Sequence, residues 1–414
     1  MPLTAEIIAI GSELLAPEFR DTNSIYLTEQ LNQIGIPVSM RTIAGDRESN
    51  LESAIRAALD RSSIVITTGG LGPTEDDVTR KVVAQTMRRQ LVLDDDVLRK
   101  LQARFKARGV QMPANNARQA LVPSEAEILD NPNGTAPGLW LTEDRKTVIL
   151  LPGPPAELQP MFQASCYPRL LKMSGGRVLR RGIYRTTGLP ESVLDSRIAP
   201  IYTRYKNPET TILSKLGQVD VHLTALARNE KDAEALLEEL GAQIEEKLGD
   251  YVFARARQEL EEVVGMYLIM KEATIAVAES CTGGLLAQRL TNLSGSSRYF
   301  QSGIVTYSNQ SKVDLAGIPP LLLEMQGAVS AEVACGLAES VRESIDTTVG
   351  VGITGIAGPT GGSAEKPVGT VYVAVAGPNG TNHRHFVFPG GRDKVRWQSS
   401  QAALDMVRRH LMDM

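Results

Sequence analysis

A serine and a lysine in the C-terminal third of the chain have the residue types and setting of a hydrolytic pair. Ser280 lies in the segment AESCTGG, directly after an apolar run and shortly before two glycines, and Lys312 follows 32 positions later (312 − 280). A serine hydroxyl becomes a nucleophile when a base removes its proton, and a lysine amine is such a base once burial lowers its pKa. Tyr307, in the segment TYSNQSK that ends at Lys312, is a candidate to position the amine or donate a proton. The pattern indicates a Ser/Lys hydrolase that acts on amides.

Other residues near this pair are candidates to hold a substrate. Backbone N–H groups at the start of the helix-like run after the two glycines are suited to an oxyanion. The glycine-rich segment GITGIAGPTGG follows another strand-like run and is typical of a phosphate or carbonyl cradle, and the arginines of PGGRDKVR are suited to a phosphate. The candidate substrate-binding residues are Thr282, Gly283, Gly284, Thr354, Gly355, Arg392 and Arg396.

From these residues alone, simpler interpretations stay open. A serine before a Gly-Gly turn is often only a helix N-cap, and a lysine in a polar segment is often a surface charge. Glycine-rich loops are commonly flexible turns, and arginines at a helix start are commonly solvated. Cys281 is a rival nucleophile, because a thiol at a helix N-terminus can be activated.

A second candidate site lies in the N-terminal segment ITTGGLGPTEDDVTRK. A strand-like run, a glycine loop and a helix-like run follow one another there, which aims N–H groups and a helix dipole at an anion. No Gly-Lys-Ser/Thr follows, so the segment is not a Walker loop. The candidate phosphate-binding residues are Gly69, Gly70, Gly72 and Thr74.

Carboxylates gather in and near this loop. Glu75, Asp76 and Asp77 end it, and Glu13 and Asp21 lie in the segment GSELLAPEFRDTNS. The acidic residues of the loop either cap the following helix or hold a divalent cation that bridges to phosphate. A cation would suit metal-assisted cleavage of a pyrophosphate. The candidate metal ligands are Glu13, Asp21, Asp76 and Asp77.

Both terminal parts of the chain alternate strand-like apolar runs with helical periods, which predicts βαβ units and α/β folds. The middle part changes to a shorter mixture of strands and helices, which indicates a small α+β module. We therefore predict three domains, at 1–171, 175–254 and 258–414.

The composition limits the class of protein and its partners. The 44 Lys+Arg and 48 Asp+Glu residues give no global basic field, so nucleic acid and anionic membranes are not favoured as partners. Three scattered cysteines fit a reducing compartment better than a disulfide framework. We find neither an export signal nor an apolar run approaching the ~18 residues of a membrane span. We predict a cytoplasmic protein.

The C-terminal motifs, taken together and in order, resemble the C-terminal domain of the competence/damage-inducible protein CinA family. They are AESCTGG, GIVTYSNQSK, GAVS, GITGIAGPTGG, KPVGTVY and FPGGRDKVR. The resemblance implies a Ser/Lys amidohydrolase that converts nicotinamide mononucleotide to nicotinic acid mononucleotide and ammonia without a cofactor. Ser280 then falls on the nucleophile, Lys312 on the base and Tyr307 on an assisting tyrosine. Arg392 and Arg396 fall on the basic turn that faces the nucleotide phosphate.

The N-terminal motifs resemble the molybdopterin-binding-like domain of the same family. They are GSELL, DTNS, TTGGLGPTEDD, NNARQALVP, NGTAPG and LLPGPPAEL. The resemblance implies a three-layer MoaB/MogA-type fold and ADP-ribose pyrophosphatase activity with a divalent metal. Pro17 stands where the family usually has glycine, which stiffens the loop 18–21.

The middle module falls where the family has a KH-type domain, but it shows no basic GXXG loop for RNA. We also expect a homodimer. Two other functions stay open. One is an N-terminal domain that binds a nucleotide or pterin without turnover. The other is an accessory role in DNA uptake or repair, for which the segment RVLRRGIYR at 177–185 is a modest candidate basic stripe.

Overall fold

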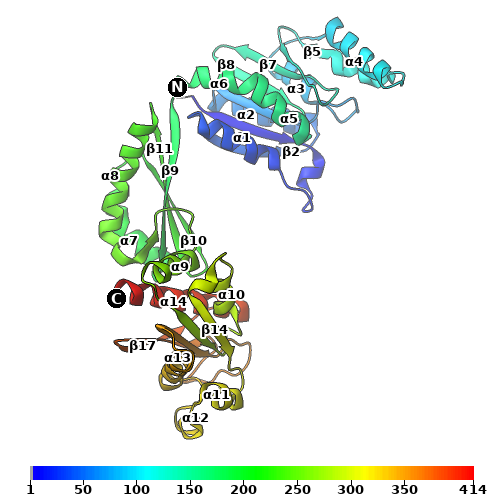
Figure 1. Cartoon of the computed structure of the whole chain (residues 1–414). Coiled ribbons are helices and arrows are strands. Elements are labelled where there is room, and N and C mark those ends of the chain that lie inside the picture. Colours follow the sequence, from blue (N-terminus) through cyan, green and yellow to red (C-terminus); the bar gives the residue numbers. More distant parts are fainter. Residues whose placement is uncertain (1–2) are drawn as a thin grey trace. The chain divides into compact units, whose positions relative to one another are not determined.

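The structure is a computed structural model that describes residues 3–414. The chain divides into two compact units. One unit runs up to Arg180 and includes Ala225–Leu236, and the other comprises Arg181–Thr224 and Leu237–Met414. Helices and sheets are mixed in both (Figure 1), which confirms the predicted α/β class.

The first unit is built on a six-stranded sheet whose strand order is β2-β1-β3-β8-β7-β6. Its first four strands are parallel, and β7 and β6 extend it in the antiparallel sense. In sheet order the strands are β2 (Val38–Ala44), β1 (Ala5–Ile10), β3 (Ile64–Thr68), β8 (Lys146–Leu151), β7 (Gly138–Glu143) and β6 (Glu127–Leu129). A separate pair joins β4 (Leu91–Leu93) to β5 (Leu121–Pro123).

Helices cover both faces of this sheet, which makes three layers. The helices are α1 (Thr22–Gln33), α2 (Glu48–Arg61), α3 (Thr79–Thr86), α4 (Asp95–Ala107), α5 (Pro155–Met161) and α6 (Tyr167–Ser174). Successive side chains of a strand point to opposite faces, so Ile7 packs in the core under α1, α5 and α6, whereas Ile8 packs in the core under α2 and α3. Burial on both faces explains the continuous apolar runs of the central strands.

The middle part of the chain forms a four-stranded sheet in the order β10-β11-β9-β12. Its elements are β9 (Val178–Thr187), α7 (Glu191–Tyr202), β10 (Glu209–Lys215), β11 (Gln218–Ala227), α8 (Glu230–Leu248) and β12 (Val252–Ala254). Apolar residues of both helices, among them Leu194 and Leu240, pack on the sheet. The division between the two units passes through β9 and β11 and through α8.

The C-terminal part forms a five-stranded sheet in the order β14-β13-β15-β16-β17. The strands are β13 (Ile275–Glu279), β14 (Phe300–Val305), β15 (Val349–Gly355), β16 (Thr370–Gly377) and β17 (Gly380–Val387). The first three strands in sheet order are parallel, and β16 and β17 are antiparallel to their neighbours. Parallel strands bring their carboxyl ends to one edge, so the segments after β13, β14 and β15 meet there.

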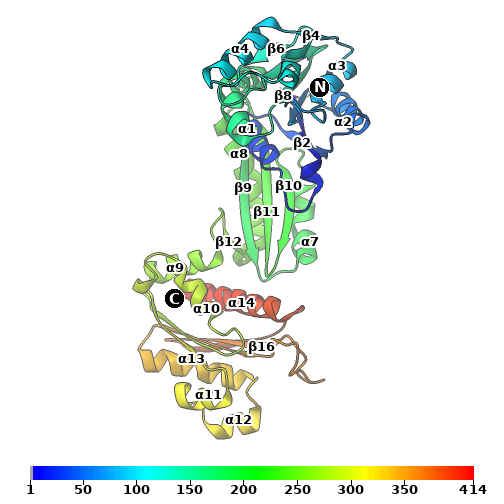
Figure 2. The same cartoon turned by 90° about the vertical axis from the view of Figure 1, so that its right-hand side faces the viewer.

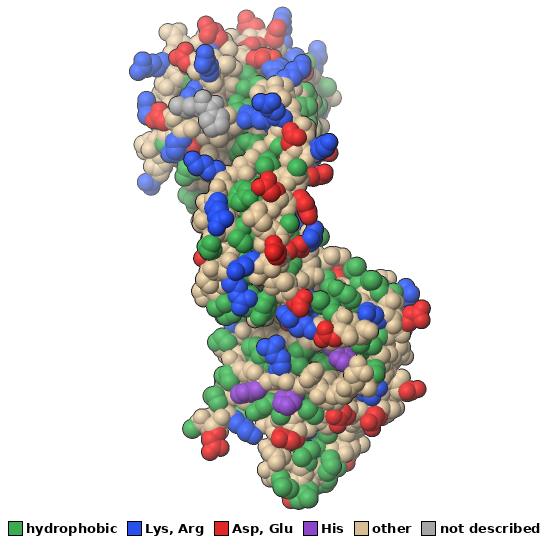
Figure 3. Space-filling view, turned by 90° about the vertical axis from the view of Figure 1, so that its left-hand side faces the viewer, with side chains coloured by type: hydrophobic (Ala, Val, Ile, Leu, Met, Phe, Trp, Pro, Cys, Tyr) green, Lys and Arg blue, Asp and Glu red, His purple; other side chains and the backbone are tan. Residues whose placement is uncertain are grey.

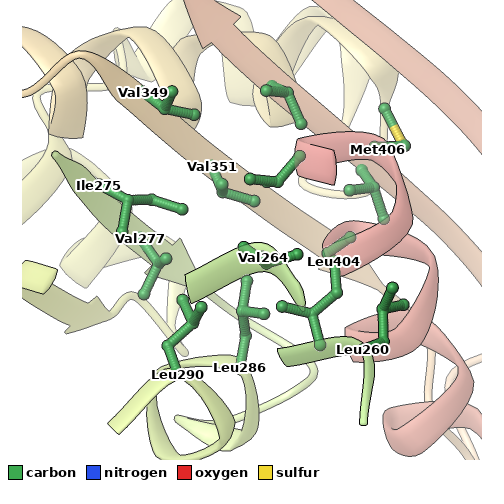
Figure 4. Packing of buried hydrophobic residues seen from close by; sticks show 14 of the residues in the cluster. Leu260, Val264, Ile275, Val277, Leu286, Leu290, Val349, Val351, Leu404 and Met406 are labelled. Carbon is green, nitrogen blue, oxygen red and sulfur yellow. The ribbon is translucent and has the colours of Figure 1, made fainter. Parts of the chain in front are cut away.

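Helices cover both faces of this sheet (Figure 2). They are α9 (Leu260–Met270), α10 (Leu285–Thr291), α11 (Asn309–Ala316), α12 (Pro320–Gln326), α13 (Ala331–Ile345) and α14 (Arg392–Met412). On one face, Val264 of α9, Leu286 of α10 and Leu404 of α14 close over Val277 and Val351 of the sheet (Figure 4). On the other face, α13 packs with α11 and α12.

Helix α13 lies so close to the sheet that glycine is required opposite it. A Cβ added at Gly352 of β15 would lie 2.2 Å from Ala334 O of α13. This glycine therefore sets the distance between helix and sheet. No helix in the part of the chain that the structure describes combines the length and apolar character needed to cross a membrane.

Candidate active site

The two residues that the sequence singled out first are in contact. Ser280 directly follows β13, and its backbone N–H donates to Ile353 O at 3.0 Å. Lys312 lies in α11, with its Nζ atom 3.1 Å from Ser280 Oγ, and Nζ also donates to Thr306 O at 2.9 Å. Both side chains are buried, with 7% of Ser280 and 2% of Lys312 exposed. The structure therefore places an amine against a serine hydroxyl in a site shielded from water.

The surroundings of Lys312 favour its neutral form. Burial lowers the pKa of Lys312 below its ordinary value, because desolvation penalises the ammonium, and the nearby Cys281 opposes this only in part. Within residues 3–414, its polar contacts are a hydroxyl and a carbonyl, and no carboxylate pairs with it. A neutral amine beside a hydroxyl can accept the hydroxyl proton.

Cys281, next to Ser280, is held in its protonated form. Its side chain belongs to the apolar core that α9, α10 and α14 share. Burial raises the pKa of the Cys281 thiol to about 12, so the thiol stays protonated at neutral pH. The thiolate is the nucleophilic form of cysteine. The structure thus favours Ser280 over its neighbour as nucleophile.

Glu279 fixes the turn that carries Ser280, and the sequence analysis missed it. Its buried carboxylate accepts backbone hydrogen bonds from Gly284 at 3.1 Å, Leu286 at 3.1 Å and Ala287 at 2.8 Å. We predicted that N–H groups at the start of α10 bind an oxyanion. That prediction is wrong for the amides of Gly284, Leu286 and Ala287, because they already donate to the carboxylate of Glu279. A charged residue ending a fully buried strand was the signal in the sequence.

The backbone N–H groups of Cys281 and Thr282 remain available. Neither donates to another residue in the described part of the chain. Both lie in the turn directly after Ser280, and backbone amides next to a nucleophile are suited to bind the oxyanion of a tetrahedral intermediate. Thr282 Oγ1 is also buried without a hydrogen-bond partner among the described residues. Gly283 and Gly284 adopt φ values of 59° and 91°, which glycine tolerates best.

Two arginines at the start of α14 connect the loops of the site. Arg396 donates from Nε and Nη2 to Thr282 O, at 3.1 and 2.8 Å. Arg392 donates from Nη1 to Gly358 O at 2.9 Å and from Nη2 to the hydroxyl of Tyr307. The two guanidinium groups thus bring the serine turn, the tyrosine and the glycine-rich loop together.

The remaining predicted residues of this site differ in exposure. The side chain of Tyr307 is 58% exposed, and its hydroxyl contacts Arg392 rather than the amine of Lys312. Thr354, in contrast, is buried, and its hydroxyl donates to Ala328 O at 2.7 Å. Gly355 ends β15 at the same sheet edge. Tyr307 is therefore open to a substrate, whereas Thr354 ties the end of β15 to the segment between α12 and α13.

The N-terminal candidates line one polar cavity of roughly 320 Å³, with two exceptions. The predicted residues on its wall are Glu13, Gly69, Gly70, Gly72, Asp76 and Asp77. Asp21 does not line it, because its carboxylate caps α1 by accepting from Ser24 N at 2.9 Å. Thr74 lies beside the cavity, where its hydroxyl donates to the carboxylates of Asp76 and Asp77.

The glycine loop of this cavity binds its own carboxylate. Asp77 accepts from Gly72 N at 2.7 Å and from Thr74 N at 2.8 Å, and Gly69 N donates to Leu151 O at 2.9 Å. Two predictions need correction. The acidic residues do not cap the following helix, since α3 has Val78 at its N-cap without a side-chain bond. The amides of Gly69, Gly72 and Thr74 are engaged, whereas within residues 69–72 the N–H groups of Gly70 and Leu71 donate to no other described residue and remain available for a phosphate.

The predicted metal ligands do not form a closed set. Among residues 3–414, no group of three or more His, Cys, Asp or Glu side chains is arranged to hold a metal ion. The carboxylates of Glu13 and Asp76 still offer hard oxygen donors in the lining of this cavity. Such a donor set fits Mg²⁺, which proteins commonly hold with one or two carboxylates together with substrate phosphates.

Three family models match successive segments of the chain. They are the probable molybdopterin binding domain over residues 6–172, the damage-inducible protein CinA KH domain over 181–254 and the CinA C-terminal domain over 257–411. A CinA-like protein of Koribacter versatilis is 51% identical over 414 residues, which cover 99% of this chain and 100% of that protein. The chain belongs to the CinA family.

Further relatives of this CinA chain match its whole length or a part of it. A CinA-like protein of Acidobacterium capsulatum is 47% identical over 414 residues, covering 99% of this chain and 100% of that protein. The crystal structure of competence/damage inducible protein CihA from Agrobacterium tumefaciens is 36% identical, with a TM-score of 0.36, and the match covers 38% of this chain and 99% of that one. The full-length relatives confirm the family resemblance of the sequence motifs.

Carboxylates pair with two of the four arginines in the basic segment 177–185 of this CinA chain. Arg180 forms an ion pair with Glu230, and Arg185 pairs with Glu259 at 2.9 Å. On the face drawn in Figure 3, positive and negative side chains are interspersed. The segment 177–185 therefore does not present the continuous basic stripe that a DNA-binding accessory would need.

Arg80 is a further residue beside the N-terminal cavity that the sequence analysis missed. It is buried, and it donates to the carbonyl oxygens of Leu71 and Gly72, which holds the glycine loop in place. Burial lowers its pKa to about 10, so it stays charged at neutral pH. The motif VTRK gave no signal of this role, because an arginine in a first helical turn is normally solvated.

Proposed function

We propose that the C-terminal domain of this CinA family member hydrolyses the carboxamide of nicotinamide mononucleotide to nicotinic acid mononucleotide and ammonia. The observation that carries the proposal is the 3.1 Å contact between the buried amine of Lys312 and the hydroxyl of Ser280. The choice of substrate follows the family resemblance of the motifs around them. The exposed tyrosine and the two arginines of α14 are compatible with a phosphorylated aromatic ligand.

The reaction has two halves that use the same pair. In the first, Ser280 Oγ attacks the carboxamide carbon while Lys312 takes the hydroxyl proton. The resulting oxyanion is held by the N–H groups of Cys281 and Thr282. The C–N bond then breaks, and the ammonium of Lys312 returns its proton to the departing nitrogen, so that ammonia leaves and an acyl ester remains on the serine.

In the second half, a water molecule attacks the acyl ester after ammonia has left. Lys312 takes a proton from the water as its oxygen attacks the ester carbon, and the same oxyanion site is used again. The bond to Ser280 Oγ breaks, and Lys312 protonates that oxygen. The carboxylic acid product leaves and loses its proton to solvent. Ser280 and Lys312 then return to their starting protonation states, ready for the next substrate.

The arginines of α14 are assigned to the phosphate of the substrate. Arg392 and Arg396 lie in the first turns of the helix, where the helix dipole adds to their positive charge. The contacts to Gly358 and Thr282 would hold the guanidinium groups in place while other N–H groups of the two side chains bind phosphate oxygens. Binding of the phosphate would position the carboxamide rather than react with it.

Ammonia release from nicotinamide mononucleotide by the full chain tests the proposal. Ser280→Ala should lower kcat by about four orders of magnitude, because the nucleophile is lost. Cys281→Ala is the matched control, one residue away in the same turn, and it should keep most of the activity. An inactive Cys281→Ala together with an active Ser280→Ala would refute the mechanism.

We infer a second activity, the metal-dependent cleavage of ADP-ribose in the N-terminal domain. Its support is the polar cavity that brings the glycine loop together with Glu13, Asp76 and Asp77. A divalent cation would neutralise charge on the pyrophosphate, and Glu13 and Asp76 would hold it. The N–H groups of Gly70 and Leu71 would bind phosphate oxygens, and Asp77 would keep the loop in shape.

Chromatography of ADP-ribose incubated with the full chain tests this second proposal. We expect AMP and ribose phosphate to form with Mg²⁺ or Mn²⁺ and not with a chelator. If ADP-ribose binds in the presence of each divalent metal ion tested but is never cleaved, the domain is a binding module without turnover.

A further inference from the structure

A separate cavity of roughly 400 Å³ lies within the second unit, between the KH-type module and the C-terminal domain. One wall comes from the turn after β9 and from the β10–β11 hairpin, and the other from β17 and α14. Its volume falls in the range of roughly 300–1,000 Å³ typical of small-molecule sites. Among the described residues on its wall, none belongs to the Ser280 site or to the N-terminal cavity.

Aromatic rings form one side of this cavity. Phe386 and Phe388 lie two positions apart on the same side of the chain, and their rings are stacked with centroids 5.0 Å apart and planes at 12°. Leu189 and Pro389 add apolar surface. Two parallel rings beside an open space are suited to a flat aromatic ligand, which gains contact area without disturbing their packing.

The same strand supplies a cation. The guanidinium of Arg384 lies 5.2 Å from the ring centroid of Phe386, and Arg384 lines the cavity. Within residues 3–414 it forms no ion pair with a carboxylate, unlike Lys215 across the cavity, which pairs with Asp220 at 2.7 Å. Arg384 is therefore held over an aromatic ring with its hydrogen-bonding edge unused by any acidic side chain.

Helix α14, on the same wall as β17, contributes the buried side chain of Gln401. Gln401 of α14 is 3% exposed, and its Oε1 accepts from Arg289 Nη2 at 2.7 Å. Its Nε2 finds no hydrogen-bond partner among the described residues, although the residue lines the cavity. The aliphatic part of Gln401 faces the β10–β11 hairpin, since a Cβ added at Gly217 would lie 3.1 Å from Gln401 Cγ. This side chain therefore adds apolar surface to the wall. Two acidic residues, Glu191 and Asp405, also line the cavity, and the carboxylate of Asp405 is paired with Arg408 and Arg409.

We propose that this cavity binds a small molecule made of a planar aromatic ring and an anionic group. The ring packs against Phe386 and Phe388, and Arg384 binds the anionic group. Nucleoside monophosphates and free heteroaromatic carboxylates share this chemistry. The site does not depend on the reaction proposed for Ser280.

The chain contains a natural reporter of this cavity. Trp397 of α14 donates from Nε1 to Leu216 O at 3.2 Å, and the next residue of that hairpin, Gly217, lines the cavity. The chain has two tryptophans, and the other, Trp140, lies in the core of the first unit. Protein labelled with 5-fluorotryptophan should therefore give two ¹⁹F resonances, one from each unit.

Titration of the labelled full chain with AMP in one arm and nicotinate in the other tests the proposal. We expect a saturable shift of the Trp397 resonance in at least one arm, and the arm that responds distinguishes a nucleotide from a free ring carboxylate. Arg384→Ala should weaken binding at least about tenfold, because the anion loses its cation. Ser214→Phe, on an exposed strand position of the wall, should abolish the shift by filling the cavity.

Two variants serve as controls. His383→Ala changes the neighbouring position of β17, which points to the opposite face of the sheet, and should bind like the wild type. Ser280→Ala should also bind normally, which separates this site from the deamidase. The proposal is overturned if neither ligand shifts the resonance at millimolar concentration. It is equally overturned if Ser214→Phe binds with unchanged affinity.

Discussion

The functional groups of the C-terminal site are already in contact with one another, whereas the candidate metal ligands of the N-terminal cavity do not come together as one group among the described residues. At the C-terminal site, the reacting groups Ser280 and Lys312 are already in contact, and Glu279 fixes the turn that carries Ser280. In the N-terminal cavity, the carboxylate of Asp77 is occupied by the amides of its own loop. No closed metal-binding group is present within residues 3–414.

The difference follows from the chemistry proposed for each region. Attack by a serine needs a neutral base at hydrogen-bonding distance, and burial of Lys312 supplies that base before any substrate arrives. Cleavage of a pyrophosphate draws part of its cation shell from the substrate. A serine hydrolase site can therefore be complete in the chain alone, whereas a Mg²⁺ site need not be.

The largest effect is expected from Lys312→Met. Loss of the base should lower kcat for ammonia release by about four orders of magnitude. Thermal unfolding should show a Tm at or above that of the wild type, because an apolar side chain replaces a buried amine that has no carboxylate partner among the described residues. Lys271→Met, at an exposed position, should change neither quantity. A large fall in Tm with Lys312→Met would mean that the amine mainly stabilises the fold.

The pH dependence of the deamidase tests the same base without a mutation. Lys312 acts when unprotonated, so kcat/KM should rise with pH and level off with a midpoint below the ordinary lysine pKa of about 10.4. The lowered pKa of Lys312 in the folded state also makes stability depend on pH. As the pH falls from the ordinary lysine pKa through the lowered one, the unfolded chain binds the proton more readily than the folded chain, so the free energy of unfolding decreases. A rate that falls over this rise in pH would exclude a neutral amine as base.

A smaller and different effect is expected from Arg392→Ala. Removing one of two phosphate-binding cations should raise KM for nicotinamide mononucleotide about 10- to 100-fold, and kcat should change less. Arg392→Lys should recover part of the loss, because it keeps the charge but not the paired N–H groups. Steady-state kinetics separates the two constants. A lowered kcat with normal KM would instead indicate that Arg392 acts through its bond to Tyr307.

In the N-terminal domain, Asp77→Asn should loosen the glycine loop and lower ADP-ribose cleavage. Ammonia release by the C-terminal site should not change. An amide accepts fewer hydrogen bonds than a carboxylate, so the amides of Gly72 and Thr74 lose part of their anchor. ADP-ribose cleavage should fall about tenfold, the size of one charge-assisted contact of roughly 1.4 kcal/mol. Asp21→Asn is the matched control, because asparagine is an equally good N-cap. Equal losses in both variants would point to general destabilisation.

Sequence reasoning reached further at the C-terminal site than at the N-terminal one, for a physical reason. Ser280 and Lys312 were found from their residue types and from the motifs around them. The structure brings them together because the strands before them, β13 and β14, are parallel and end at one sheet edge. The role of Glu279 was missed, because a carboxylate that accepts three amides depends on the local turn and not on spacing. Motif order likewise gave no hint that Asp77 turns back to the glycine loop and that Asp21 points to its own helix.

The smallest effect is expected from Pro17→Gly, which tests whether the loop before α1 limits the N-terminal site. Pro17 lies in an exposed turn after Leu15, where Ala16 O accepts from Phe19 N at 3.3 Å. Glycine there mainly loosens the unfolded chain, so unfolding free energy should fall by less than about 1 kcal/mol. Cleavage of ADP-ribose should change less than about twofold, because Asp21 remains fixed as the cap of α1. A tenfold gain in turnover would show instead that proline holds this loop away from the cavity, and that its carboxylates join the metal site only when the turn is free to move.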